Sequence, residues 1–134
     1  MVKGETNLSK LIASMTPELN DGAYVFTTVK DVSVIPREIT LFEFKEKEGV
    51  TVVLERSQAD ALHLEYHFVA AWITLLIHSS LEAVGLTAAF SNALTEHNIS
   101  CNVVAGYYHD HIFVGTGDAI KAMSVLTALA ESSK

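Results

Sequence analysis

Apolar residues recur at helical spacing in three segments of the chain, and they alternate or form short runs in the segments between them. The clearest helical stripe falls on Leu86, Ala89, Phe90, Ala93 and Leu94. These positions are i, i+3, i+4, i+7 and i+8, one face of a helix, so a helix is predicted to about His97. The same spacing predicts a helix over 118–131 and a short one over 8–15, ending before Pro17.

Between these helices, β-branched and aromatic runs bounded by turn residues predict strands. The predicted strands cover 24–29, 40–45, 50–54, 66–77, 102–105 and 111–114. A turn at Asn20-Asp21-Gly22 precedes the first strand, the charged segment KEKEG joins the second to the third, and SQADAL forms one or two helical turns. From residue 66 onward the predicted order is therefore strand, helix, strand, strand, helix.

The predicted strand at Trp72–Ile77 does not alternate between apolar and polar residues. A sheet with helices on one face and water on the other shows such alternation, so both faces of this strand are expected to be covered. The helices over 86–97 and 118–131 can cover one face. The other face needs the first half of the chain, a second copy of it, or both, which favours a homodimer or a higher homo-oligomer.

Two segments about 60 residues apart share one plan of strand, polar junction and Ala-containing helix. They read VTVVLERSQADAL and HIFVGTGDAIKAM. This pseudo-repeat predicts two units, residues 1–65 and 66–134. Only about ten residues separate the first two strands of the first unit, too few for the helix that the second unit has there. We expect the helix over 8–15 to pack in that place.

The composition excludes several classes of function. The chain has 134 residues and a formal net charge of −7, with nine Lys and Arg residues against sixteen acidic ones, which leaves no basic surface for nucleic acid. The longest apolar stretch, 68–77, is too short to span a bilayer, and the N-terminal segment lacks the apolar core of a signal peptide. The single cysteine, Cys101, forms no internal disulfide. A cytoplasmic protein that binds neither nucleic acid nor membrane is expected.

The segment GYYHDHIFVG carries the most conspicuous side chains. On an extended strand His109 and His111 point to the same side, so they can supply two metal ligands. A catalytic zinc needs a third ligand, and nothing in the sequence brings His67 or His78 near. In the alternative interpretation, Tyr107–Asp110 form a hairpin tip whose polar side chains satisfy backbone groups of the turn. We favour the hairpin tip and expect no metal or other cofactor, with a metal-dependent enzyme as the alternative function.

Two other features are reminiscent of catalytic or nucleotide sites. Cys101 begins a strand, where a buried inert thiol is the commoner state. The segment GTGD, Gly115–Asp118, lies between a strand and a helix, as a phosphate-binding loop does. However, Ile120 takes the place of the third glycine, and Asp118 would repel phosphate. We interpret both features as structural, with Thr116 or Asp118 as a helix cap.

The segment WITLLIHSSLEAVGLTAAFSNALTEHNISCNVV runs as strand, loop, Val84-Gly85-Leu86, helix, turn and strand. It resembles the ACT domain, a small regulatory module that commonly binds amino acids, in the Gly-Leu start of the helix and in the passage to the next strand. HSSLEAVGLTAAFSNAL together with SCNVVAGYYHDHIFV resembles, more closely, a bacterial family of uncharacterised stand-alone proteins built from two ACT-like units. The resemblance covers residues 17–130.

The resemblance implies an α+β fold of the ferredoxin-like class: ACT-like βαββα(β) units in a tandem pseudo-repeat, with a largely antiparallel sheet and helices packed on one face. Two features depart from the pattern, because no strand follows the last helix and the first unit lacks a helix. Strands must therefore be shared between the units. The implied function is regulatory and not enzymatic: binding of a small amino acid or related metabolite, read by an unidentified enzyme, regulator or transporter.

The loop before the helix at residue 86 is the expected ligand site. A helix that opens at Gly85 offers backbone N–H groups and a positive dipole end to a carboxylate, and glycine lets a ligand approach closely. Loop hydroxyls and the amide of Asn102 add hydrogen-bonding groups. In ACT domains ligands lie at this loop and at the interface between units. The predicted ligand-binding residues are His78, Ser79, Ser80, Val84, Gly85, Leu86, Thr87, Asn102, Val103 and Tyr107.

Two alternatives to a ligand site remain open. The same helix start, capped by its own residues, needs no ligand. The chain would then serve as a purely structural protein of oligomerisation, with neither ligand nor metal.

Overall fold

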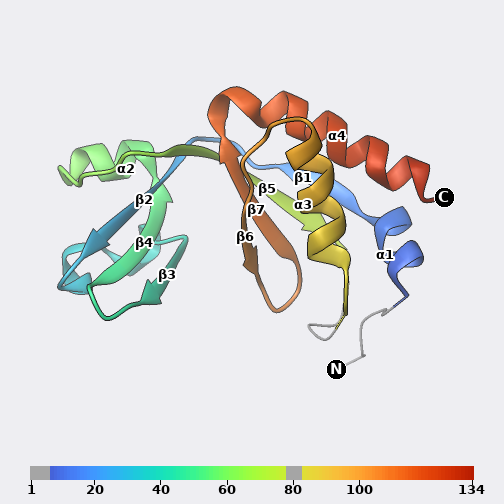
Figure 1. Ribbon diagram of the computed structural model, residues 1–134. Helices are drawn as coiled ribbons and strands as arrows, with labels where there is room; N and C mark the ends of the chain where they lie inside the picture. Colours follow the sequence, from blue (N-terminus) through green and yellow to red (C-terminus); the bar gives the residue numbers. More distant parts are fainter. Residues whose placement is uncertain (1–6, 78–82) are drawn as a thin grey trace. The chain divides into compact units, whose positions relative to one another are not determined.

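A computed structural model describes residues 7–77 and 83–134 (Figure 1). Contacts between residues divide the chain into two compact units. Asp21–Ala71 form one, here called the inner unit. The chain up to Asn20 and the segment Trp72–Lys134 together form the other, here called the outer unit. Both units are mixtures of antiparallel strands and helices, as the sequence predicts.

The inner unit consists of β2 (Tyr24–Val29), β3 (Phe42–Lys45), β4 (Val50–Glu55), α2 (Arg56–Ala61) and the first residues of β5 (Val69–Leu76). Its strand order is β3-β4-β2-β5, and each strand runs antiparallel to its neighbour. Its core contains Val25, Ile35, Val52, Leu54 and Ala59. Two 3-10 turns, η1 (Val32–Val34) and η2 (Arg37–Ile39), lie where the ferredoxin-like pattern has its first helix.

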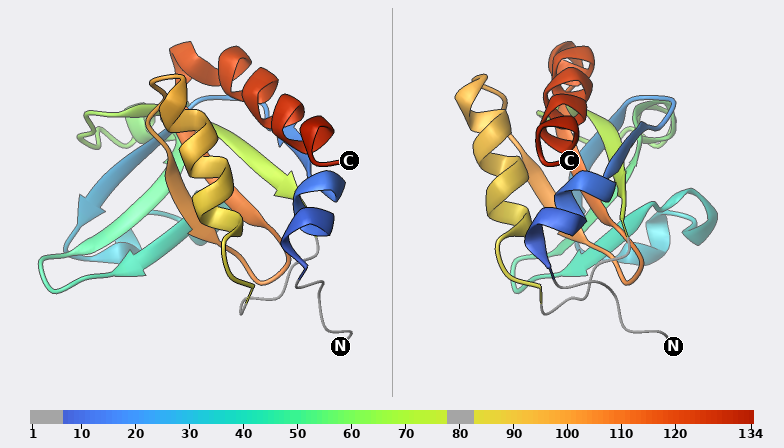
Figure 2. Two further views of the ribbon diagram at one scale, coloured as in Figure 1. Left: turned by 45° about the vertical axis from the view of Figure 1, so that its right-hand side comes forward. Right: turned by 90° about the vertical axis from the view of Figure 1, so that its right-hand side faces the viewer.

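The outer unit consists of α1 (Leu8–Ser14), β1 (Thr16–Leu19), the rest of β5, α3 (Leu86–Glu96), β6 (Asn102–Ala105), β7 (Asp110–Gly115), η3 (Thr116–Asp118) and α4 (Ala119–Ser132). Its strand order is β1-β5-β7-β6. Helices α3 and α4 pack against each other, and α4 also contacts β1 and β7. Figure 2 shows both helices on the same face of these strands.

The strand that the C-terminal half lacks is supplied by β1. It pairs antiparallel with β5, with Thr16 opposite Leu76 and Leu19 opposite Ile73. At its other end β5 pairs with β2, with Tyr24 opposite Ala70. One strand thus completes the sheet of the inner unit and begins that of the outer unit. This sharing confirms the inference drawn from the resemblance, although the sequence did not reveal β1 as a strand.

Helix α1 does not take the place of the helix missing from the first half, so that expectation is wrong. It packs against α4 and α3 in the outer unit, with Leu11 and Ile12 buried (Figure 2). The inner unit instead fills that place with its 3-10 turns, whose Ile35 is 4% exposed. The contacts accordingly group the chain up to Asn20 with the second half, whereas the sequence divides the chain after residue 65.

Both faces of β5 are covered to different degrees. Ile73 and Leu75 are fully buried on one face. On the other face Thr74 is 6% exposed, whereas Trp72 and Leu76 are half-buried. This second face is therefore not a solvated one, which explains why apolar Trp72 and Leu76 occupy it and the strand shows no apolar–polar alternation.

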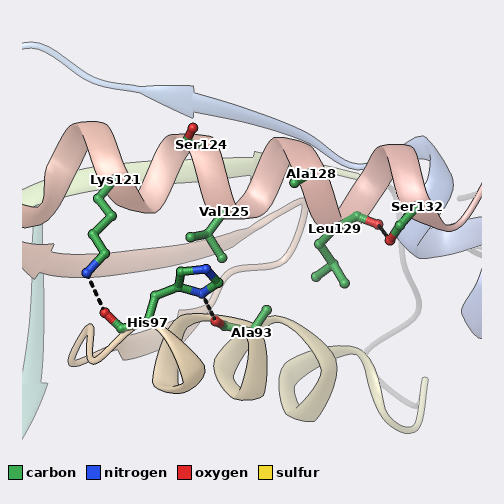
Figure 3. A pocket seen from close by; sticks show the side chains of 8 residues that line it. All are labelled: Ala93, His97, Lys121, Ser124, Val125, Ala128, Leu129 and Ser132. Atoms are coloured by element: carbon green, nitrogen blue, oxygen red, sulfur yellow. Dashed lines mark hydrogen bonds between the residues drawn. The ribbon is translucent and has the colours of Figure 1, made fainter.

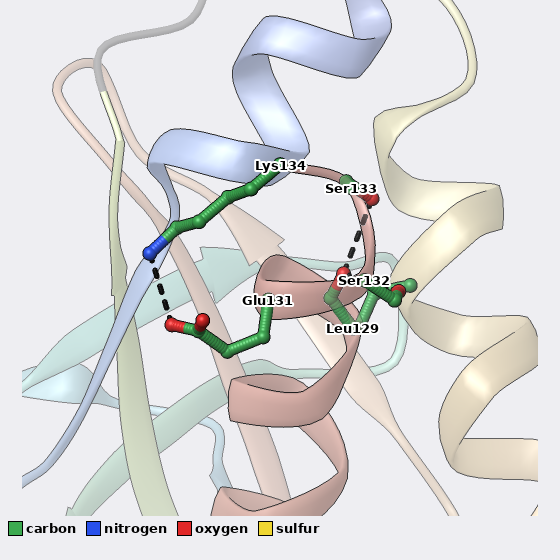
Figure 4. Close-up of polar contacts among 5 residues, drawn as sticks. All are labelled: Leu129, Glu131, Ser132, Ser133 and Lys134. Atoms are coloured by element: carbon green, nitrogen blue, oxygen red, sulfur yellow. Dashed lines mark hydrogen bonds and ion pairs between the residues drawn. The ribbon is translucent and has the colours of Figure 1, made fainter.

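The last turn of α4 is closed by its own residues (Figure 4). The Ser133 hydroxyl donates to the Leu129 carbonyl oxygen at 3.1 Å, and Lys134 pairs with Glu131 at 2.9 Å. These contacts satisfy a carbonyl at the helix end and place a cation near its negative dipole end.

The packing of α1 predicts a large loss of stability when Leu11 is replaced by Ala. Leu11 is 1% exposed, so Leu11→Ala should lower the free energy of unfolding by about 2–5 kcal/mol. Lys10→Ala on the exposed side of the same helix should change it by less than about 0.5 kcal/mol. Urea unfolding of both variants measures the difference, and equal effects would contradict the packing described.

Candidate functional site

The start of α3 has the geometry that the sequence suggests. Gly85 is the N-cap residue in the left-handed region, with φ 97° and ψ −13°. The first bond of the helix joins the Ala89 N–H to the Gly85 carbonyl oxygen at 2.9 Å. The N–H groups of residues 86–88 therefore have no partner within the helix, and glycine has no side chain to cap them. Together with the positive end of the helix dipole, they suit a carboxylate.

The described residues around this helix start differ in exposure. Val84 is 86% exposed and Thr87 is exposed, whereas Leu86 is buried. A Cβ atom added to Gly85 would lie 3.1 Å from Cδ2 of Leu8, a residue of α1. The space beside the glycine is thus partly filled by Leu8. Among the residues that the structure describes, the exposed Val84 and Thr87 mark a side from which a ligand can approach.

The structure brings only some of the predicted site residues together. His78, Ser79 and Ser80 lie outside the described residues. Tyr107 is in the turn between β6 and β7, at the same end of the outer unit as the start of α3 (Figure 1). Val84, Gly85, Leu86 and Thr87 are contiguous, as the chain requires.

Asn102 and Val103 lie at the other end of the outer unit. Helix α3 runs away from Gly85 for its whole length before the chain turns back into β6, so the start of β6 is far from the start of α3 (Figure 1). The Asn102 side-chain amide donates instead to the Phe113 carbonyl oxygen at 3.3 Å. The expectation that this amide joins the glycine loop is corrected.

The turn Gly106–His109 closes the hairpin of β6 and β7, with the Gly106 N–H donating to the His109 carbonyl oxygen at 2.9 Å. The interpretation of this segment as a hairpin tip is confirmed, although Asp110 already belongs to β7 and pairs with Ala105. Two tyrosines occupy the tip, with Tyr107 and Tyr108 ring centroids 5.1 Å apart in an edge-on arrangement.

His109 and His111 are engaged with different partners. His109 Nδ1 lies 3.4 Å from the Ile77 carbonyl oxygen. His111 Nδ1 lies 3.0 Å from Trp72 Nε1 and 3.2 Å from Thr74 Oγ1. Within the described part of the chain, no three His, Cys, Asp or Glu side chains are grouped to hold one metal ion. Sequence reasoning missed the partners of His111, because they come from a strand 37–39 residues away.

The titratable groups near this hairpin are affected chiefly by burial. Burial raises the pKa of the Asp110 carboxyl, while His111 and His109 oppose the change. Burial lowers the pKa of the His111 imidazole, His109 adds to the effect, and Asp110 opposes it. Burial also raises the pKa of the Cys101 thiol to about 11, so at neutral pH this residue is protonated and a poor nucleophile.

In the GTGD segment Gly115 ends β7 and Thr116–Asp118 form η3, with Asp118 also the N-cap residue of α4. Asp118 makes no side-chain capping hydrogen bond there. The expected side-chain cap is therefore absent at this residue, because the preceding 3-10 turn leads the backbone directly into the helix.

A groove of about 540 Å³ lies between α3 and α4, away from the predicted site (Figure 3). It is lined by Ala93, His97, Lys121, Ser124, Val125, Ala128, Leu129 and Ser132. Small side chains such as Ala93 and Ala128 leave the space between the helices open. The Lys121 ammonium donates to the His97 carbonyl oxygen at 2.7 Å and so joins the two helices.

Two smaller hollows, of about 240 and 270 Å³, lie beside the 3-10 turns of the inner unit. The first is lined by Tyr24, Glu38, Ile39, Thr40, Leu41, Glu55 and Gln58. The second is lined by Val32, Ser33, Ile35, Pro36, Arg37, Thr40 and Glu43. Sequence analysis singled out none of these residues, because the hollows arise from the irregular path of 32–40.

Comparison with known families identifies the units. The ACT domain family matches residues 3–71 and again residues 68–128. The chain belongs to the ACT domain family. Both matches meet within β5, which agrees with its role as a strand of both units.

Solved structures share the fold of this chain. A protein of unknown function from Vibrio cholerae, described as a possible transport protein, is 48% identical, with a TM-score of 0.83 over 92% of this chain and 95% of that one. An Agrobacterium tumefaciens protein is 15% identical, with a TM-score of 0.65 over 87% and 89% of the two chains. A putative C-terminal regulatory domain of aspartate kinase from Porphyromonas gingivalis is 14% identical, with a TM-score of 0.60 over 88% and 98%. The last two show likeness of fold alone.

No curated protein matches the chain. Among the residues that the structure describes, none of the helices has the length and apolar character needed to cross a bilayer.

The backbone at Gly85 predicts a position-specific cost of adding a methyl group. Gly85→Ala should lower the free energy of unfolding by about 1–2 kcal/mol, because an L-residue is strained in the left-handed region. Crowding against Leu8 adds to this cost. Gly117→Ala is the matched control, since a Cβ atom there meets nothing within 4 Å. Chemical unfolding compares the two, and similar losses for both variants would argue against the backbone described for Gly85.

Proposed function

We propose that this ACT-domain protein is a regulatory module that binds a small amino acid, or a related metabolite, at the start of α3. The observation that carries the proposal is the helix start itself, in a chain of the ACT domain family. Gly85 leaves three consecutive N–H groups without partners in the helix, and the exposed Val84 and Thr87 flank the approach to them. A ligand carboxylate can accept hydrogen bonds from these groups in the positive field of the dipole.

The proposed role is regulatory and not enzymatic. The Cys101 thiol has a raised pKa. The imidazoles of His109 and His111 both contact other groups of the protein. These side chains are therefore poorly suited to nucleophilic or acid–base chemistry. We propose instead that the ligand changes an equilibrium of a homodimer or higher homo-oligomer, which a partner enzyme, regulator or transporter reads.

The test is a thermal-shift screen of the full chain against the twenty amino acids. A ligand present at 100 times its Kd stabilises the native state by about 2.7 kcal/mol, which raises the Tm. The amide derivative of an active amino acid lacks the carboxylate and should give no shift. A screen with no shift at millimolar ligand would contradict the proposal.

Two variants of Thr87 locate the site. Thr87→Asp places a carboxylate in the first turn of α3, where it stabilises the helix by about 0.3–1 kcal/mol and repels a ligand carboxylate. We expect this variant to keep its unliganded Tm or raise it, and to lose the ligand-induced shift. Thr87→Asn has a similar size without the charge and should keep the shift. Equal ligand responses in both variants would show that the ligand binds elsewhere.

A further inference from the structure

Four side chains of the outer unit form a hydrogen-bonded network across three strands. Trp72 and Thr74 point to the same face of β5, His111 lies on β7, and Asn20 follows β1. Trp72 Nε1 lies 3.0 Å and Thr74 Oγ1 3.2 Å from the same atom, Nδ1 of His111. The Asn20 side-chain amide donates to Thr74 Oγ1 at 3.0 Å and to the Trp72 carbonyl oxygen at 3.2 Å.

The chemistry of these groups fixes the protonation of the histidine. An indole N–H is only a donor, so Nδ1 of His111 must accept from Trp72 and carries no proton. Thr74 Oγ1 already accepts from Asn20, and its hydroxyl hydrogen is free to point at the same Nδ1. The indole contact therefore requires a neutral imidazole with its proton on Nε2. Protonation of Nδ1 would set N–H against the indole N–H and remove that bond, whereas the Thr74 hydroxyl can turn and accept from the protonated nitrogen.

We propose that His111 is a proton-sensitive latch of the outer unit, which holds β7 to β5 through the Trp72 indole at neutral pH and releases the indole in acid. Its position gives the release a structural consequence. Thr74 and Trp72 also hold Asn20, whose own N–H donates to the Trp72 carbonyl oxygen at 2.9 Å. Loss of the latch should therefore loosen β1, the strand that completes the sheet.

Some ionisable groups around His111 favour protonation of its ring and others oppose it. On its own strand, His109 opposes protonation and Asp110 favours it. From β1, the exposed Glu18 is opposite Thr74 in the pairing register and shares its face. On β6 the register partner of His111 is the apolar Val104, and on β7 itself Phe113 stacks on Trp72. Burial adds to the cost of charging the ring.

The lowered pKa of His111 sets the pH window. An ordinary histidine titrates near pH 6.5, so the unfolded chain binds this proton before the native chain does. The latch is complete above that pH. Between the unfolded and native pKa values the unfolded chain carries more protons, so stability falls as pH falls. The folded-to-unfolded ratio then decreases by up to about tenfold per pH unit from this group.

The single tryptophan of the chain provides a direct readout. In the full-length protein we expect Trp72 fluorescence and its indole N–H resonance to change together in one titration below pH 6.5, before the chain unfolds. Protection factors of the β1 amides, corrected for the intrinsic pH dependence of exchange, should fall over the same range. A wild-type protein without this transition before acid unfolding would overturn the proposal.

Matched variants separate the latch from the other five histidines. His111→Gln keeps an acceptor for the indole but does not titrate. The tryptophan transition should therefore disappear, together with the part of the pH dependence of the free energy of unfolding that His111 contributes. His109→Gln changes the neighbouring histidine and should leave the transition in place. Persistence of an unchanged transition in His111→Gln would also overturn the proposal.

A second measurement covers the case in which His111→Gln does not fold. Trp72→Phe removes the indole donor from Nδ1. The pKa of His111, followed by NMR of its ring protons, should then rise relative to wild type. An unchanged or lower pKa in Trp72→Phe would show that the indole contact does not hold the ring neutral.

Discussion

The sharing of β5 between two sheets is the constraint on which the rest of the structure depends. Its first residues pair with β2, with Val25 opposite Val69, and its last residues pair with β1, with Thr16 opposite Leu76. In the outer unit β7 is its other neighbour. A strand with neighbours along its length and helices on one face has few positions left for solvated side chains. The largely apolar run from Trp72 to Ile77 follows from this position.

The two ends of β5 in the outer unit carry different chemistry. Its beginning holds Trp72 and Thr74, whose polar atoms are committed to Asn20 and His111. Its end leads toward the glycine-started helix α3, where backbone donors remain without partners in the helix. His109 joins the hairpin to the end of β5 through the Ile77 carbonyl oxygen. Two histidines at the start of β7 thus contact different parts of the neighbouring segment, His111 the side chains of β5 and His109 the carbonyl of Ile77 just after it.

The sequence predicted the regular elements well because their signals are local. The stripe from Leu86 to Leu94 gave α3, and the runs at 24–29 and 102–105 gave β2 and β6. Strand β1 was not predicted, because Pro17 and the exposed Glu18 give it no strand pattern and only its pairing with β5 defines it. The packing of α1 was misplaced for the same reason: an amphipathic stripe shows that a face is buried but not which partner buries it.

The sequence predicted only those parts of the candidate site whose residues are adjacent in the chain. Val84–Thr87 follow one another in the chain, and Gly85 has the left-handed backbone that its residue type favours. The prediction placed Asn102 near these residues, but the whole length of α3 separates it from the start of that helix. The contact of Leu8 with Gly85 and the bond from Trp72 to His111 depend on tertiary structure. No local pattern in the sequence encodes either.

The insertion of one unit within the other also bears on how the chain folds. The inner unit is a continuous segment, whereas β1 and β5 of the outer unit are separated by all of it. Pairing these strands in an unfolded chain would carry the entropy cost of closing a long loop. Once the inner unit has formed, the pairing of Tyr24 with Ala70 holds its two ends as neighbours. The inner unit thereby acts as a template that delivers β1 and β5 to each other, and its early formation should speed assembly of the rest.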